Sequence, residues 1–274
     1  TRFLHKLKPD LYLSTDAYLS LRSNTRQLAV FHDLNFEHSP HDFPKIHLWH
    51  YKKFFPKYAK KAARIITVSE FSKQDICNNY GIDPDKIDVV YNGANDGFCP
   101  VDDDVRLDIR NKFSQGKPYF MFVGSLHPRK NLARLFTAFD IFKNRNDNDI
   151  KLLIVGNKKW WTEPIKNAYE AMTHKEDVIF AGRLSAEDLH LVTASALASV
   201  YVSYFEGFGI PIVEAFKCDT PVITSNVTSM PEVAADAALL IDPFKEESIA
   251  DAMEKIMDEN LRHELINKGR IRRQ

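Results

Sequence analysis

The feature that most constrains the fold is a regular alternation of short apolar runs with longer stretches of helical periodicity. The apolar runs predict ten strands: Leu11–Ser14, Leu28–His32, Arg64–Ser69, Ile87–Tyr91, Tyr119–Val123, Lys151–Gly156, Val178–Ala181, Ser199–Ser203, Pro221–Thr224 and Ala238–Ile241. The periodic stretches predict seven helices: Ile46–Ala63, Ser72–Tyr80, Leu132–Lys143, Thr162–Met172, Ala186–Ala196, Pro211–Cys218 and Glu246–Met257. Several runs, such as KLLIVG, are apolar almost throughout, which is typical of parallel strands covered on both faces. The pattern predicts an α/β protein built from right-handed strand–helix–strand units.

The alternation is interrupted once, by a polar, acidic and turn-rich segment between residues 97 and 117. We interpret residues 101–117 as a linker between a first α/β domain, residues 1–100, and a second, residues 118–274. Too few strands precede the linker for a full doubly wound sheet. We therefore expect the N-terminal domain to be incomplete.

Charge and cysteine content narrow the class of protein. The chain has 37 basic and 37 acidic residues, so no net charge favours a nucleic-acid partner. No apolar run approaches the roughly 18 residues that span a bilayer. Cys77, Cys99 and Cys218 fit neither a metal-binding spacing nor a disulfide framework. This usage favours a reducing, cytoplasmic location.

Glycines cluster where ligands bind in open parallel sheets. Only ten are present, yet five closely follow apolar runs: Gly124, Gly156, Gly182, Gly207 and Gly209. Ligands of such sheets bind at the carboxyl ends of the strands, where glycine lets the backbone approach them. Glycine also serves in any tight turn, but five on one edge favour a binding edge.

The segment YFEGFGIPIVEAF, residues 204–216, predicts a strand end, a loop and a helix that starts at Pro211. Glu206 would lie in the loop and Glu214 in the first helical turn. The amide groups at the start of the helix favour an anion, whereas the carboxylates favour neutral hydroxyl groups. A nucleotide sugar carries both kinds of group. The alternative is that Glu214 only complements the helix dipole and Glu206 is solvated.

A second segment, YFMFVGSLHPRKN, predicts a strand, a glycine turn and a basic tip formed by Arg129 and Lys130. Two cations beside a helix start can clamp a diphosphate. Taken alone, the pair is equally compatible with a solvated basic turn. Its occurrence together with the two glutamates favours the clamp.

These segments, with VIFAGRLSAEDLHL and the run through TSMPEVAADAALLIDPF, resemble the retaining glycosyltransferases of family 4. The resemblance covers nearly the whole second domain, and Glu206–x7–Glu214 matches the signature of that family. VFHDL, IITVSEFSKQDI and VVYNGAND resemble later elements of its first domain. The resemblance implies the GT-B fold, in which two Rossmann-like domains face each other across a cleft. It also implies transfer of a hexose, with mannose as one option, from a GDP- or UDP-linked donor.

The resemblance assigns the donor-site roles residue by residue. Glu214 would hold the ribose hydroxyls, Glu206 would contact the transferred sugar, and Lys130 would bind the diphosphate. The backbone that follows Glu206 would help it to contact the transferred sugar at four positions: Gly207, Phe208, Gly209 and Ile210.

Other matches are looser. Many relatives have an arginine where this chain has Ser125, so Arg129 would substitute for it. Gly124 would admit the phosphates. Gly182 and Arg183 match positions that grip the base.

In the first domain, His32 matches a histidine of the cleft near the sugar and the acceptor. Ser69 and Asn92 either line the cleft or act as cap and turn residues.

No metal is expected. The acidic pairs Asp102–Asp104 and Asp147/Asp149 fall in the linker and before a strand, away from the binding edge. Lys130, Arg129 and the helix start would then neutralise the leaving diphosphate. The two glutamates are expected to position the donor, not to act as a glycosidase acid–base pair. The resemblance implies retention of configuration.

The acceptor is expected to be a saccharide or a lipid-linked saccharide. Residues Lys45–Arg64 carry seven basic residues, no acid and interleaved aromatic residues. They resemble a basic amphipathic helix that rests on the inner face of an anionic membrane, with a kink or break at Pro56. The alternative is a solvated helix whose Trp49 and Phe54 face the core. Two other functions stay open: a GT-B epimerase and a non-catalytic sugar-nucleotide-binding subunit.

Overall fold

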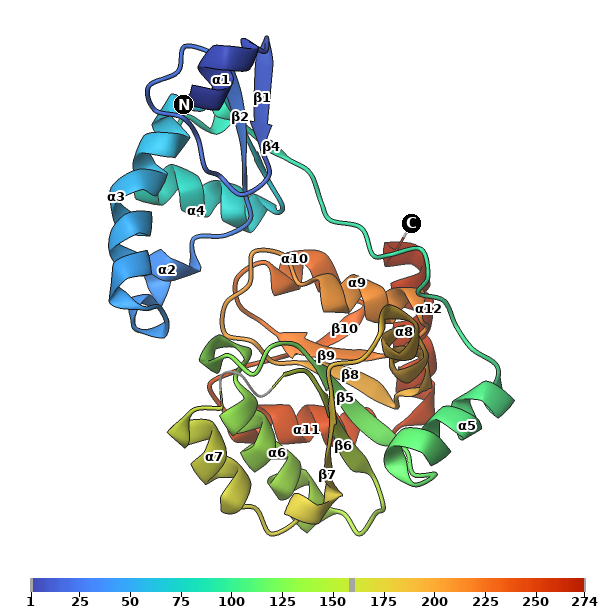
Figure 1. Cartoon of the computed structure of the whole chain (residues 1–274). Helices are drawn as coiled ribbons and strands as arrows, with labels where there is room; N and C mark the ends of the chain where they lie inside the picture. The colour runs from blue at the N-terminus through green and yellow to red at the C-terminus, as the bar shows by residue number, and fades with distance from the viewer. Residues whose placement is uncertain (1, 158–160, 274) are drawn as a thin grey trace. The chain divides into compact units, whose positions relative to one another are not determined.

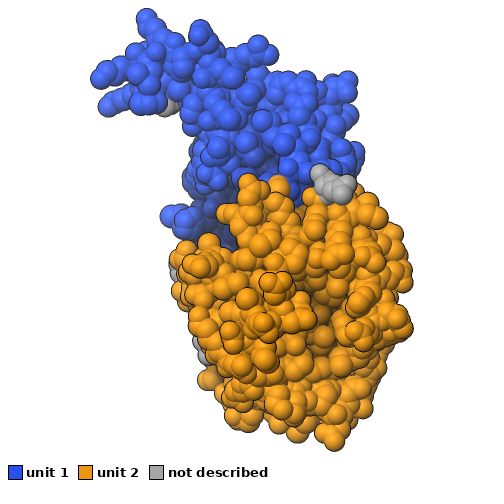
Figure 2. Space-filling model, turned by 90° about the vertical axis from the view of Figure 1, so that its right-hand side faces the viewer, with its two compact units in different colours: residues 1–92, 206–208 blue, residues 93–205, 209–274 orange. Residues whose placement is uncertain are grey.

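The computed structural model of the chain describes residues 2–157 and 161–273. The chain divides into two compact units, residues 1–92 with 206–208 and residues 93–205 with 209–274 (Figure 2). Each unit contains one parallel sheet with helices packed against it (Figure 1). No helix within the described ranges is long and apolar enough to cross a membrane.

The first unit contains a four-stranded parallel sheet in sequence order. Its strands are β1 (Leu11–Ser14), β2 (Arg26–Phe31), β3 (Arg64–Thr67) and β4 (Ile87–Val89). Its helices are α1 (Arg2–Leu7), α2 (Asn35–His38), α3 (Lys45–Lys61) and α4 (Glu70–Tyr80). The core between sheet and helices is rich in aromatic rings, with Phe31, Phe36 and Tyr58 buried.

Helix α3 continues through Pro56, where we expected a kink or a break. Proline removes one backbone hydrogen bond, at a cost of roughly 3 kcal/mol in a helix interior. Tyr51 and Phe55 before the proline and Tyr58 after it pack against the same core. This shared packing holds both halves of the helix on one surface.

The second unit contains a six-stranded parallel sheet with the order β10-β9-β8-β5-β6-β7. Its strands are β5 (Tyr119–Val123), β6 (Lys151–Val155), β7 (Val178–Gly182), β8 (Ala198–Tyr201), β9 (Val222–Ser225) and β10 (Ala238–Ile241). From β5 the chain builds outward to β7, then returns and builds in the other direction from β8. The strand order therefore reverses between β5 and β8, which makes this pair the topological switch point of the sheet.

Helices cover both faces of the second sheet because its strands bury alternate residues on each side. Phe120 and Phe122 of β5 pack in a core with α6 (Leu132–Arg145) and α11 (Glu246–Lys255). Tyr119 and Met121 face the other side, against α5 (Asp103–Ser114) and α8 (Ala186–Ser195). The remaining helices are α7 (Glu163–Glu170), α9 (Ile210–Lys217), α10 (Met230–Ala234) and α12 (Glu259–Arg272).

All ten predicted strands are present, with ends that differ by at most two residues. The segment expected to be a turn-rich linker forms helix α5, whose Ile109 is buried. Helix α12 was not predicted either, since only Leu265 and Gly269 in it are buried. A helix with so little buried surface carries a weak apolar period.

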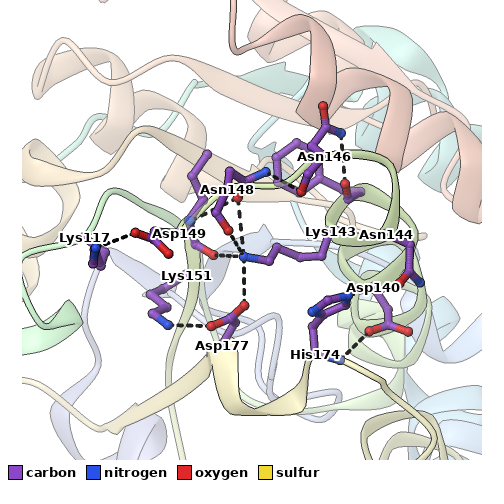
Figure 3. A network of polar contacts seen from close by, with 12 residues as sticks. Lys117, Asp140, Lys143, Asn144, Asn146, Asn148, Asp149, Lys151, His174 and Asp177 are labelled. Carbon is purple, nitrogen blue, oxygen red and sulfur yellow. Dashed lines mark hydrogen bonds and ion pairs between the residues drawn. The ribbon is translucent and has the colours of Figure 1, made fainter.

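The amino ends of β6 and β7 are held together by a network around the buried Lys143 (Figure 3). The Lys143 ammonium lies 2.8 Å from a carboxylate oxygen of Asp177 and donates to the backbone oxygens of Asn148 and Ile150. Lys151 donates to the other oxygen of Asp177. Burial raises the pKa of Asp177, but the hydrogen bonds from the two lysines outweigh it and hold the pKa below 3.8.

We predict that Lys143→Met destabilises the second unit by about 2–3 kcal/mol, because Asp177 and two backbone oxygens lose a buried donor. Urea unfolding followed by circular dichroism measures the change. The low pKa of Asp177 means that its contribution is present at neutral pH and is lost as the pH falls below about 4.

Lys117→Met is the matched control. Lys117 pairs with Asp149 at the same edge of the sheet, but both side chains are substantially exposed. An exposed pair contributes less than about 1 kcal/mol, so this variant should unfold close to the wild type. Equal losses in the two variants would show that burial of Lys143 adds nothing.

Candidate functional site

Three glycine turns lie side by side at the carboxyl ends of β5, β6 and β7. The Gly124 amide donates to the Val155 oxygen at 3.0 Å, and the Gly156 amide donates to the Gly182 oxygen at 2.8 Å. A Cβ atom at Gly156 would lie 1.9 Å from the Gly124 oxygen. No other residue fits there. The turns therefore approach each other more closely than side chains would permit.

Lys130 lies at the same edge, in the turn Pro128–Lys130 that follows β5. Its side chain is only 7% exposed, so the solvated basic turn considered above is wrong for this residue. The Lys130 ammonium donates to the Tyr201 hydroxyl at 2.7 Å and lies 4.6 Å from the centre of the Tyr201 ring. Its Cε atom lies 3.5 Å from the point where a Cβ of Gly124 would stand. The glycine thus provides the space that the lysine chain occupies.

Arg129 and Asn131 join this turn to the loop that follows β8. The Arg129 guanidinium donates to the Phe205 oxygen at 3.0 Å, and the Tyr204 amide donates to the Arg129 oxygen at 3.0 Å. Asn131, in the left-handed region at φ 62°, donates to Val202 at 3.1 Å. Part of the guanidinium of Arg129 is therefore committed to holding the loop.

Helix α9 begins on the β8 side of the switch point, one residue earlier than predicted. Gly209 precedes it at φ 107°, a backbone conformation that favours glycine. Because the helix starts at Ile210, Glu214 lies in the second turn and not in the first. This corrects our placement of Glu214 and removes the helix-dipole explanation for it. Burial raises the pKa of the half-buried Glu214 carboxyl.

Tyr201 was missed by the sequence analysis. It is the last residue of β8, almost fully buried, and its ring lies 3.5 Å from the Cβ position of Gly209. It thus contacts the helix start on one side and Lys130 on the other. A tyrosine at the end of a buried strand needs a partner for its hydroxyl, and that requirement was the available signal.

A cavity of about 500 Å³ opens beside this group, at the ends of β6 and β7. Its lining includes these described residues: Gly156, Asn157, Phe180, Gly182 and Arg183. Apart from its chain neighbours, no atom of the described residues comes within 4 Å of the Cβ position of Gly182, and Arg183 is exposed. Gly182 and Arg183 therefore border open space next to the glycine turns.

The other predicted residues occupy separate places. Glu206, Gly207 and Phe208 are buried in the connection from β8 to α9 and group with the first unit. Ser125 is exposed, as is Ile210.

In the first unit, His32 directly follows β2, and its Nε2 lies 2.9 Å from the Thr15 oxygen. Ser69 caps α4 by accepting from the Ser72 amide at 3.0 Å. Ser69 is therefore a helix cap, which was one of the two roles expected for it.

The acidic pairs have local roles. Asp102 precedes α5, and Asp103 pairs with Arg106 one turn later. Asp149 pairs with Lys117. Within the described residues, no group of three or more histidine, cysteine, aspartate or glutamate side chains is arranged to hold a metal ion.

Comparison with known proteins matches both parts of the chain to families. Residues 105–272 match the family described as glycosyl transferases group 1, and residues 1–98 match glycosyltransferase family 4. The O-antigen chain mannosyltransferase B of Escherichia coli is 29% identical over 97% of this chain and 70% of its own length. The O-antigen chain mannosyltransferase RfbU of Salmonella typhimurium is 28% identical over 84% of this chain and 60% of its own length.

Solved structures agree on the fold. Sucrose-phosphate synthase from Thermosynechococcus elongatus aligns with a TM-score of 0.83 at 21% identity, over 100% of this chain and 71% of that one. Anabaena HepE in complex with UDP-glucose aligns with a TM-score of 0.81 at 18% identity, over 98% and 74%. The matched family model covers more than half of the chain. The chain therefore belongs to the glycosyl transferases group 1, the family 4 glycosyltransferases with the GT-B fold.

Proposed function

We propose that this protein transfers a hexose, with mannose the first candidate, from a nucleoside-diphosphate sugar to a saccharide or lipid-linked acceptor. The product would be a polysaccharide or glycolipid, and the sugar would keep its anomeric configuration without help from a metal. The observation that carries the proposal is the convergence of buried Lys130 with the glycine turns at the switch point. Two relatives are O-antigen mannosyltransferases, which supports mannose.

The second unit would bind the donor. The diphosphate would lie on the backbone around Gly124 and pair with the Lys130 ammonium, which Tyr201 holds in position. Lys130 would stabilise the charge that develops on the leaving diphosphate. The base would enter the cavity beside Gly182 and Arg183, whose volume of about 500 Å³ suits a nucleobase. HepE binds UDP-glucose, so uridine and guanosine donors are both tested below.

Glu214 would accept hydrogen bonds from the ribose hydroxyls, and Glu206 from the transferred sugar. Arg129 would act chiefly by holding the loop from Tyr204, since its guanidinium already donates to Phe205. The first unit would present the acceptor, with His32 at the end of β2 near the reacting sugar. These assignments rest on the family pattern and on the positions of the residues along the strands.

An assay of released nucleoside diphosphate tests the function. A transferase releases GDP or UDP from its sugar nucleotide much faster when an acceptor saccharide is present. An epimerase changes the sugar without net release, and a binding subunit retains the donor unchanged. No release with any acceptor, in protein that binds the donor, would favour the binding subunit.

We predict that Lys130→Ala weakens binding of the preferred nucleoside diphosphate by about 10- to 100-fold, because one charged contact to phosphate is lost. Binding of the free nucleoside, which has no phosphate, should change less than threefold. Calorimetric titration with GDP, UDP and their nucleosides measures both. Equal losses for the two ligands would contradict the clamp. Tyr201→Phe, which keeps the ring but not the hydroxyl, should give a smaller loss than Lys130→Ala.

Glu214→Gln should weaken nucleoside and nucleoside diphosphate by a similar factor, about 10-fold, because both contain the ribose that Glu214 would contact. The same titrations give this result. Glu264→Gln is the matched control, since that carboxylate is exposed on α12 and pairs with Lys268. A loss confined to the diphosphate would place Glu214 at the phosphates and not at the ribose.

Helix α3 would rest on an anionic membrane at the cytoplasmic face. Ile46 is 74% exposed and Trp49 is 57% exposed, one turn apart, whereas Phe54 packs against the core. The alternative in which both Trp49 and Phe54 face the core is thus wrong for Trp49. The Lys53 ammonium lies 4.5 Å from the Trp49 ring. An exposed apolar pair flanked by lysines suits a lipid surface.

The double substitution Ile46→Ser and Trp49→Ser should reduce sedimentation with vesicles of anionic phospholipid at least fivefold, because apolar area is lost from the contact. Ile271→Ser, at an equally exposed isoleucine of α12, should have no effect. Equal binding of wild type and double variant would exclude α3 as the contact.

A further inference from the structure

A second cavity lies at the amino ends of the strands of the second sheet, the edge opposite the glycine turns. Its volume is about 670 Å³. Its floor includes residues that directly precede β5, β6, β8 and β9: Pro118, Ile150, Leu197 and Pro221. Its walls come from α5 and α12, two helices that the sequence pattern did not predict. The donor site proposed above does not use this edge.

Three guanidinium groups line this cavity: Arg106 and Arg110 from α5 and Arg262 from α12. The three are close enough that Arg106 and Arg262 act electrostatically on Arg110. Burial lowers the pKa of Arg110 below its ordinary value, and the neighbouring charges of Arg106 and Arg262 lower it further. The cavity therefore concentrates positive charge on a half-buried group.

Backbone oxygens, not carboxylates, hold two of the three arginines. Arg110 Nε donates to the Ser195 oxygen at 3.1 Å. Arg262 donates to the Ile256 and Met257 oxygens at 2.8 and 2.9 Å. Within the described parts of the chain, neither guanidinium forms an ion pair with a carboxylate. Arg106 pairs with Asp103, whose side chain is 93% exposed.

The acidic residues of the cavity wall are committed elsewhere or lie at its rim. Asp149 pairs with Lys117, and Asp219 pairs with Arg270 at 2.7 Å and with Arg273 at 3.0 Å. Glu259 is exposed and lies 3.8 Å from His263. Within the described residues, no carboxylate thus lies at ion-pair distance from Arg110 or Arg262, although the more distant Asp103 acts electrostatically on Arg110. An anion between them would relieve the repulsion within the cluster.

We propose that this cavity binds a small phosphate-bearing molecule, held by Arg106, Arg110 and Arg262. Guanidinium groups bind phosphate oxygens through paired hydrogen bonds, and each arginine here has N–H groups beyond those used on backbone oxygens. The volume lies within the usual range for small-molecule sites. The site is separate from the donor site and would join α5 to α12 across the strand ends.

Calorimetric titration with inorganic pyrophosphate at constant ionic strength tests the proposal. The titration uses Lys130→Ala protein, so that pyrophosphate bound at the proposed donor clamp does not contribute. We expect saturable binding of one pyrophosphate. Adding Arg110→Gln or Arg262→Gln should weaken it at least tenfold. Absence of saturable binding in Lys130→Ala protein would overturn the proposal.

Lys112→Gln is the matched control, because it removes one positive charge from the same helix outside the cavity. Lys112 pairs with Asp188 at the surface. It should change the affinity less than twofold, and a loss equal to that of Arg110→Gln would also overturn the proposal. Arg106→Gln, whose guanidinium already pairs with the exposed Asp103, serves if either of these variants fails to melt cooperatively. If the wild type binds a second pyrophosphate and Lys130→Ala does not, that second molecule was bound at the proposed donor clamp. Its loss tests the donor clamp and not the arginine cavity.

Discussion

The reversal of strand order between β5 and β8 determines where the rest of the second unit can place a ligand. Connections after β5 and β8 leave the sheet in opposite directions, so their first residues are not covered by a crossover helix. The turn after β5 carries Lys130, and the loop after β8 leads to Gly209 and the start of α9. Lys130 and Tyr201 are 71 positions apart in the sequence, and they meet there because β5 and β8 are neighbours in the sheet. Tyr201 completes the junction by contacting both sides.

Burial of Lys130 makes this junction electrostatically costly. Removing an ammonium group from water costs several kcal/mol, and the Tyr201 hydroxyl and ring are among the contacts that offset this cost. A buried cation also needs a turn that holds its side chain in place, and Arg129 and Asn131 both donate hydrogen bonds to the loop after β8.

Most of the fold was predictable because short apolar runs alternate with helical patterns, and all ten predicted strands are present. The helices that were missed are polar or short: α5 and α12 bury few residues, so no apolar period marks them. Within the candidate site, the glycine turns and Lys130 follow from the residues at strand ends, whereas Glu214 was predicted in the wrong helical turn. The contacts of Tyr201 could not be predicted in this way, because they depend on the turn after β5 and the loop after β8 meeting at the switch point. The predicted start of α9 was one residue too late, which placed Glu214 in the first turn. In the structure Glu214 lies in the second turn, so the argument from the helix dipole no longer applies to it.

Two neighbouring stretches of the amino edge of the second sheet pair their charged side chains in different ways. At the amino ends of β6 and β7, lysines are matched with acids, as in the group formed by Lys143, Lys151 and Asp177 (Figure 3). At the amino ends of β5, β8 and β9, Arg110 and Arg262 are held by backbone oxygens instead. A charge that is paired with an opposite charge attracts an anion weakly, whereas a half-buried cation without a carboxylate partner is stabilised when an anion binds beside it. A net charge of zero conceals this difference, since 37 basic and 37 acidic residues can be matched or segregated locally without altering the sum. The pairing of each partly buried cation, and not the overall composition, is therefore the basis on which we propose a phosphate site at this edge.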